Sequence, residues 1–195
     1  MARPRNYDDD QVLNGAIALF RERGYAGTNV PDLISKLGIC RQSLYNTFGD
    51  KRGLYLKALE RWGQLEIDTK LDLLKSAGSP LDNLRTVIRS FAAMATTCPS
   101  DGCLTARAMA ESREDAEAMA VVKRQVERLE NGIRAALERA RELGELRHDV
   151  RPERLARALT TASYGMGLLS RLPGSGPRIA DAVSVLLGIL DDAAT

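Results

Sequence analysis

Apolar residues recur at intervals of three and four along almost the whole chain, and no stretch alternates with the period of two that a half-buried strand requires. The pattern therefore predicts an all-α protein. The expected helices cover about residues 7–23, 29–37, 41–48, 51–74, 81–97, 103–112, 114–143, 152–171 and 177–191.

The second and third helices are short and lie close together in the sequence. Thr28 is expected to cap the second helix, Pro31 falls within its first turn and Gly38 ends it. Two helices joined by a short turn that contains glycine form a helix-turn-helix, whose second member can enter the major groove of DNA. The spacing therefore indicates a DNA-binding unit.

The third helix has one apolar side and one side of hydrogen-bonding groups. Leu44 and Phe48 are four residues apart and are expected to pack inward with Ile39. Arginine can read guanine, and glutamine or asparagine can read adenine, through paired hydrogen bonds, whereas Tyr45 and Lys51 suit phosphates. The residues left facing outward are Arg41, Gln42, Ser43, Asn46 and Thr47.

The formal net charge is only +2, but all of the excess lies in residues 1–60, which hold nine Lys or Arg against seven Asp or Glu. Arg3 and Arg5 lie in an N-terminal arm that could reach a phosphate backbone; an ordinary polar terminus is the alternative. No apolar run approaches the roughly 20 residues of a membrane span. We expect a soluble cytoplasmic protein with no membrane contact, because no signal peptide is visible and the three cysteines form no CxxC.

Residues 24–59 resemble the DNA-binding half of TetR-family transcriptional regulators, in which G-[FY]-x-x-T leads to LG-[VI] and then to L-Y-x-x-F-x-x-K. The matching positions are Gly24, Tyr25, Thr28, Leu37, Gly38, Ile39, Leu44, Tyr45, Phe48 and Lys51. The resemblance implies a three-helix helix-turn-helix domain over 1–50, joined by a long helix to a helical effector-binding and dimerisation domain over 51–195. It also implies operator contacts from Arg41, Gln42, Ser43, Tyr45, Asn46 and Thr47, with Thr28 and Lys51 on phosphates. The operator sequence stays open, because Asn46 and Thr47 stand where an aromatic residue or histidine is common.

The same resemblance implies a repressor that binds a pseudo-palindromic operator as a dimer and is released by a small molecule. The stretch "DGCLTARAMAE" is similar to one C-terminal subgroup of the family. We expect an apolar effector in a cavity among the central helices. Its candidate contacts are Trp62, Phe91, Met94, Thr105, Arg107, Met109 and Tyr164.

The last two predicted helices, about 152–171 and 177–191, are apolar on more than one side and should therefore pack against more than their own domain. The resemblance implies a two-fold dimer in which these helices from both subunits form a four-helix bundle. Dimerisation also follows from recognition itself, because a two-fold dimer reads two half-sites where one short helix has few contacts.

Several alternatives remain at this stage. Residues 114–143 could form a coiled coil. Cys98 and Cys103 flank a turn, and Cys40 begins the recognition helix, so a thiol switch is conceivable. The chain could also be an all-helical carrier protein without operator function. An enzyme is disfavoured and no metal or cofactor is expected, because His148 is the only histidine and no HExxH, G-x-S-x-G or glycine-rich phosphate loop is present.

Overall fold

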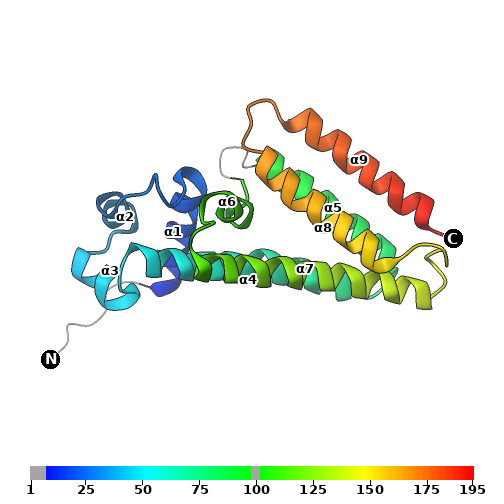
Figure 1. Cartoon of the computed structure of the whole chain (residues 1–195), viewed down its shortest axis with the longest axis horizontal. Coiled ribbons are helices and arrows are strands. Elements are labelled where there is room, and N and C mark those ends of the chain that lie inside the picture. The colour runs from blue at the N-terminus through cyan, green and yellow to red at the C-terminus, as the bar shows by residue number, and fades with distance from the viewer. Residues whose placement is uncertain (1–7, 98–101) are drawn as a thin grey trace.

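The computed structural model describes residues 8–97 and 102–195, and for residues 94–97 it describes the backbone alone. Over these ranges the chain is helical apart from turns and one isolated bridge between Leu146 and Ala194, which confirms the all-α prediction (Figure 1). The helices are α1 (Asp9–Arg23), α2 (Val30–Leu37), α3 (Arg41–Phe48), α4 (Lys51–Lys75), α5 (Pro80–Thr97), α6 (Leu104–Glu111), α7 (Ala116–Glu142), α8 (Pro152–Leu169) and α9 (Gly176–Ala193).

The cap of α2 differs from the prediction by one residue. Asn29 caps the helix, because its side-chain oxygen accepts a hydrogen bond from the Asp32 amide at 2.8 Å. Thr28 is instead buried, and its hydroxyl donates to the Gly24 carbonyl at 2.7 Å. Thr28 therefore closes the turn after α1.

A sharp corner separates α6 from α7 at residues 112–115. Asp115 caps α7, since one carboxylate oxygen accepts hydrogen bonds from the amides of Glu117 and Ala118, each at 3.1 Å. α7 then packs along α4 and against α8 of the same chain, so its apolar stripe is already covered. The coiled-coil alternative for 114–143 is therefore wrong.

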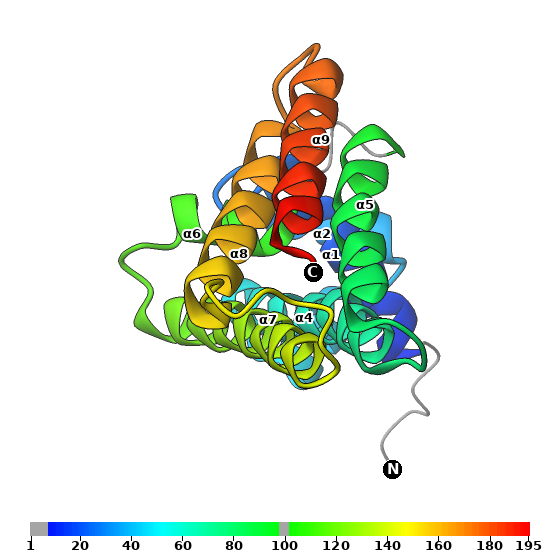
Figure 2. The ribbon, with the colours of Figure 1, turned by 90° about the vertical axis from the view of Figure 1, so that its right-hand side faces the viewer.

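α4 and α7 lie side by side and form a long base for the rest of the molecule (Figures 1 and 2). The short helices α2 and α3 lie at one end of this base. α5, α8 and α9 pack together over the other end, where the chain terminates. The arrangement places the helix-turn-helix far from α9, with α4 as the direct covalent connection between the two ends.

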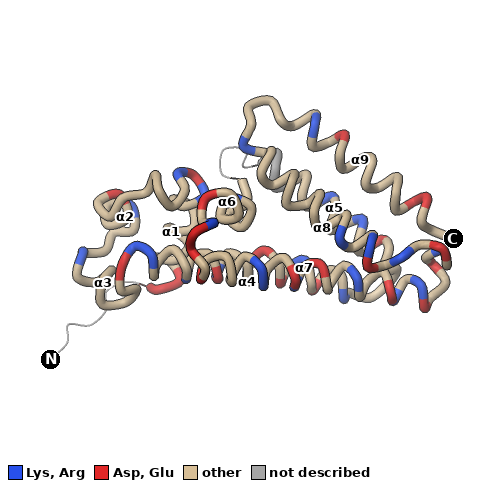
Figure 3. Tube along the Cα trace, in the orientation of Figure 1, with Lys and Arg blue, Asp and Glu red and all other residues tan. Residues whose placement is uncertain are grey.

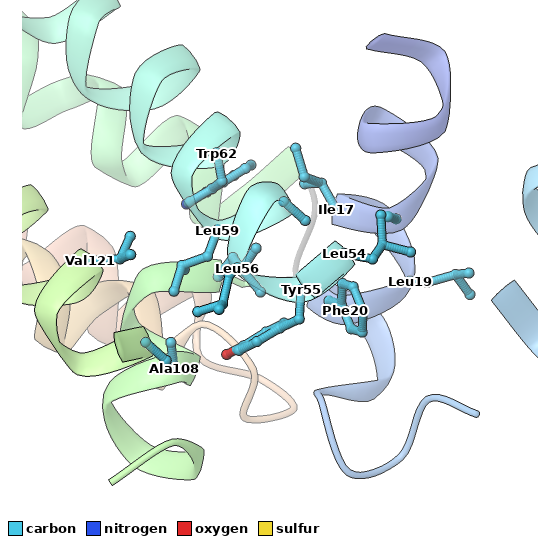
Figure 4. Close-up of a cluster of buried hydrophobic side chains, with 14 of the residues drawn as sticks. Ile17, Leu19, Phe20, Leu54, Tyr55, Leu56, Leu59, Trp62, Ala108 and Val121 are labelled. Atoms are coloured by element: carbon cyan, nitrogen blue, oxygen red, sulfur yellow. The ribbon is translucent and has the colours of Figure 1, made fainter. Parts of the chain in front are cut away.

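The buried apolar side chains form two clusters. The first combines α1 to α3 and the first half of α4 with α6 and the start of α7, and Figure 4 shows Phe20, Tyr55 and Ala108 within it. The second cluster joins the rest of α4 and α7 to α5, α8 and α9. The domain division at residue 50 stays a prediction, and the first cluster continues across it into α4.

A polar bridge lies where α4 and α7 come close. The Gln125 amide donates to the Leu59 carbonyl at 2.7 Å and accepts from the Thr105 hydroxyl at 2.7 Å. Gly63 makes this possible, because a Cβ at that position would lie 2.2 Å from Nε2 of Gln125. The bridge thus joins α4, α6 and α7 through one buried side chain.

An ion pair ties the start of α4 to the start of α7. Arg52 donates to both carboxylate oxygens of Asp115 at 2.8 Å and to Glu117 at 2.9 Å. The hydrogen bonds from Arg52 are the main reason that the pKa of Asp115 falls to about 2. Because the pKa is lower in the folded state, the ionised carboxylate stabilises the fold.

We expect Asp115→Asn to lower the thermal midpoint by about 1–3 °C near neutral pH, the range for a solvent-screened ion pair. Asparagine still caps a helix, so the substitution tests the charge. The stabilisation is present above the unfolded pKa near 3.8 and is lost as the pH falls through about 2. The thermal midpoints of the wild type and of Asp115→Asn should therefore converge as the pH is lowered from 7 to 2. Glu114→Gln, in the same loop, serves as the control. A difference that stays constant to pH 2 would contradict the ion-pair role.

Candidate nucleic-acid interface

The turn before α3 depends on a left-handed glycine. Gly38 ends α2 with φ 64°, a conformation that other residues adopt at a cost, and its amide donates to the Ile34 carbonyl at 3.1 Å. Ile39 is then buried, and α3 is held by the fully buried Leu44 and by Phe48. The inward side of α3 is therefore as predicted.

The outward side of α3 consists of two ordered pairs. The Arg41 guanidinium lies 5.8 Å from the centre of the Tyr45 ring, and the Gln42 amide donates to Oδ1 of Asn46 at 2.8 Å. All four side chains are exposed, whereas Ser43 and Thr47 are half-buried. Both pairs join residues four apart, so they form two parallel columns on one face of the helix. After these contacts, Gln42 keeps a free carbonyl acceptor and Asn46 an amide donor for external partners.

Cys40 lies beside this face. The residue is exposed, and its sulfur is 3.2 Å from the Ser43 hydroxyl. The hydrogen bond from that hydroxyl is the main factor that lowers the pKa of the thiol.

Thr28 and Lys51 lie behind α3. Thr28 is completely buried and its hydroxyl donates to the Gly24 carbonyl, so its predicted phosphate contact stays a prediction. The Lys51 ammonium donates to the Thr28 carbonyl at 2.7 Å and lies 4.2 Å from the centre of the Tyr25 ring. Burial lowers the pKa of Lys51. Its phosphate contact stays a prediction, and in this structure Lys51 fastens α4 to the turn after α1.

Basic and acidic positions are interspersed along α4 and α7 (Figure 3). Near the recognition face, Arg41 is exposed and no carboxylate pairs with it among the described contacts, while Arg23 pairs with Asp32 at 2.8 Å. Arg3 and Arg5 of the predicted arm lie outside the described residues. The exposed positive charge on α3 therefore comes from one arginine.

The predicted effector contacts do not gather at one site. Met109 and Tyr164 line a pocket of about 520 Å³ between α6, α7 and α8. Trp62 instead lies under the guanidinium of Arg21, 4.5 Å away, and Phe91 lies 5.1 Å from the Lys70 ammonium. Thr105 belongs to the Gln125 bridge, and Met94 is outside the described side chains. Trp62, Phe91 and Thr105 make these contacts within the fold and do not line this pocket, so their effector contacts stay predictions.

The pocket is mainly apolar with a few polar groups. Thr160 is only 2% exposed, and its hydroxyl has no hydrogen-bond partner among the residues that the structure describes. Burial raises the pKa of Tyr164, whose ring forms part of the wall. The complete lining is Ala106, Met109, Ala110, Val126, Glu130, Thr160, Thr161, Tyr164, Gly165 and Leu168. A buried hydroxyl without a partner is costly in a finished core, so its presence here is typical of a ligand site.

α6 connects this pocket to the helix-turn-helix. Arg107, predicted as an effector contact, donates to the carbonyls of Arg21 and Glu22 at 3.0 and 3.1 Å and pairs with Glu111 at 2.6 Å. Arg171, after α8, donates to the same Arg21 carbonyl at 2.7 Å. Two guanidinium groups thus bind the carbonyl end of α1, where the helix dipole favours positive charge.

α8, α9 and the connection between them carry exposed apolar side chains. Large side chains with exposed fractions between 39% and 62% are Leu168, Leu169, Leu172, Val185 and Ile189. Exposed apolar patches of this kind mark interaction surfaces on soluble domains.

Sequence reasoning missed Gln125, Glu130, Thr160 and Arg171. Gln125 and Thr160 each carry a signal, because they are polar residues within the apolar stripe of a long helix. Glu130 resembles the other surface charges of α7, and Arg171 lies in a loop beside the predicted helix end. Their positions follow only from the tertiary packing.

Within the described residues, no helix is long and apolar enough to cross a bilayer. No cluster of three or more His, Cys, Asp or Glu in the same ranges could hold a metal ion.

Two family models match the chain. Residues 12–58 match the model described as bacterial regulatory proteins, tetR family, and residues 80–186 match the tetracyclin repressor-like C-terminal domain. Among curated proteins, the chain is 32% identical over 194 residues to the uncharacterized HTH-type transcriptional regulator YezE of Bacillus subtilis, covering 98% of this chain and 100% of that protein.

Solved structures agree with these matches. A TetR transcriptional regulator from Chloroflexus aurantiacus is similar in fold, with a TM-score of 0.84, 22% identity and coverage of 95% of this chain and 94% of that chain. A cysteine mutant of the TetR family transcriptional regulator CifR, complexed with 26-base-pair operator DNA, has a TM-score of 0.80 at 25% identity and covers 98% of this chain and 97% of its own.

The exposed arginine of α3 gives a test of base reading. We expect Arg41→Ala to reduce discrimination between a specific site and random DNA by about 1–3 kcal/mol, because a paired contact to a base is lost. Arg41→Lys should lose similar discrimination but keep non-specific affinity and its salt dependence, since the charge remains. Titrations of both variants on specific and scrambled duplexes at several salt concentrations measure this. An equal loss on both duplexes would assign Arg41 to the phosphates.

Proposed function

The chain belongs to the TetR family of bacterial transcriptional regulators, and we propose that it is a dimeric repressor that a small molecule releases from its operator. Members of this family are regulators and not enzymes, so the reaction to explain is reversible binding. The matched C-terminal domain is described as tetracyclin repressor-like, which supports repression rather than activation of transcription.

The outer face of α3 is the observation that carries the proposal. Arg41 and the Gln42–Asn46 pair are exposed on a helix whose opposite side is buried by Leu44 and Phe48. Such groups can form paired hydrogen bonds with base edges in a major groove. Double-stranded operator DNA is the proposed partner, as in the complex of the relative CifR.

Dimerisation through α8 and α9 completes the proposal. Dimers are typical of this family, and the exposed apolar side chains of these helices are available to pack against the same helices of a second copy. Burying an exposed leucine or valine stabilises an interface by about 1.5–3 kcal/mol per side chain at most. A two-fold axis at this face gives two recognition helices, each for one half-site of a pseudo-palindrome.

The pocket between α6, α7 and α8 is the proposed effector site. Met109 and Ala106 line it from α6, and Arg107 of the same helix holds the carbonyl end of α1. A ligand that shifts α6 therefore displaces α1 and, through α2 and α4, which pack on α1, the recognition helix α3. In a dimer this displacement changes the separation of the two recognition helices and weakens operator binding.

Operator binding is tested with the purified protein and duplexes from the DNA that flanks its own gene. Fluorescence anisotropy against scrambled competitor at fixed salt should reveal a site bound at least about 10³-fold more tightly than random sequence. Binding with no preference on all flanking fragments would count against the repressor and favour the carrier alternative.

We expect Val185→Glu to separate the dimer into monomers and to abolish cooperative binding to a full operator, because a carboxylate would be buried at the interface. Val185 is 62% exposed within one chain, so the substitution leaves the monomer fold intact. Leu143→Glu is the matched control, since Leu143 has the same exposed fraction of 62% but lies at the far end of α7. Sedimentation equilibrium distinguishes the species; a dimeric Val185→Glu protein would place the interface elsewhere.

A further inference from the structure

The pocket between α6, α7 and α8 combines apolar walls with a single carboxylate. We propose that it binds an amphipathic organic cation: an apolar body of aromatic or aliphatic groups that carries one amine or quaternary ammonium. The inference rests on the proposed effector site and adds the chemical class of the ligand.

The charge of the pocket lining favours a cationic ligand. Glu130 of α7 is the one ionisable acid or base besides Tyr164 in the described lining, and no Lys, Arg or His contributes to it. Its side chain is only 33% exposed, so the carboxylate is partly withdrawn from water and attracts a nearby cation more strongly than a fully exposed group would. An anionic ligand in the same pocket would meet this charge with no basic residue in the described lining to offset it.

Glu130 is available to such a ligand. Its partner in the described structure is Arg157, at 3.5 Å, and the side chain of Arg157 is 70% exposed. A pair at this distance with one partner in solvent contributes little. A bound ammonium can therefore take its place while Arg157 remains hydrated.

The other pocket residues fit the remainder of such a molecule. Thr160 supplies a buried hydroxyl without a partner in the described residues, which can bond to a neutral polar group of the ligand. Tyr164 offers an aromatic face, against which a cation or a ring can pack. Met109 and Leu168 complete an apolar wall that adapts to the ligand's shape. A volume of about 520 Å³ accommodates a drug-sized molecule.

A matched pair of fluorescent probes tests the sign of charge directly. Dansylcadaverine carries an ammonium and dansyl-6-aminohexanoate a carboxylate, on the same fluorophore and chains of similar length. Both brighten when the dansyl group enters an apolar site. In titrations of the full-length protein, we expect dansylcadaverine to bind about five- to tenfold more tightly than the carboxylate, the range for one partly buried ion pair.

Four variants assign the effect to residues. Glu130→Gln should weaken binding of the cationic probe alone and so remove the preference for it. Arg157→Ala should increase this preference, because it removes the guanidinium that competes with the probe for Glu130. Thr160→Val, which keeps the shape of the side chain, should weaken both probes alike. Glu127→Gln is the control, because Glu127 lies on the exposed side of the same helix, 3.7 Å from Lys123. Thermal melts of each variant confirm that it is folded.

The outcomes separate this inference from the proposed function. Equal binding of the two probes, or a preference that survives Glu130→Gln, overturns the cation assignment, and so does the absence of any fluorescence increase. Operator binding by the unliganded wild type is measured separately by anisotropy, and it establishes the regulator whichever way the probes behave. A cation preference without specific DNA binding would keep the pocket and reject the repressor.

Discussion

The burial of Tyr55 is the constraint on which the rest of the structure depends. A three-helix DNA-binding unit of this length is too small to bury a sufficient core alone. Tyr55, on α4, is 2% exposed; its ring lies 5.0 Å from that of Phe20 and 4.9 Å from that of Tyr25, and its hydroxyl is 3.0 Å from the Ser112 hydroxyl. One side chain thus joins α1, α4 and the corner between α6 and α7. The helix-turn-helix end therefore shares its core with residues of α4, α6 and α7.

This shared core joins the helix-turn-helix to the rest of the chain without a flexible linker. α6 presents Met109 to the pocket on one side and Arg107 to α1 on the other. Arg171 adds a second contact to the same carbonyl end, so α8 also acts on α1. These polar contacts hold α6 and the segment after α8 against the end of α1. α6 therefore contacts both the pocket and the end of α1.

Sequence reasoning predicted the helices and the recognition face because both depend on local spacing. Leu44 and Phe48 lie one turn apart, and that spacing alone turns Arg41 and Gln42 outward. The surroundings of Lys51 were harder to predict because they come from a distant part of the chain: its ammonium donates to the Thr28 carbonyl, 23 residues earlier. The effector residues were harder still. Trp62 and Phe91 have the composition of a ligand wall, but only the packing decides whether an apolar side chain fills a core or borders a pocket.

The guanidinium of Arg21 covers the indole of Trp62 at 4.5 Å, while its Nε donates to the Gly102 carbonyl at 3.0 Å. Trp62 is 6% exposed and is the only tryptophan in the chain. Its emission therefore comes from one location, at the contact between α1 and α4, where a cation lies over the ring. Trp62 is therefore an intrinsic fluorescent probe of this contact. A movement of α1 that takes Arg21 away from the indole changes the surroundings of the ring, and the fluorescence emission spectrum of the unlabelled protein would record that change.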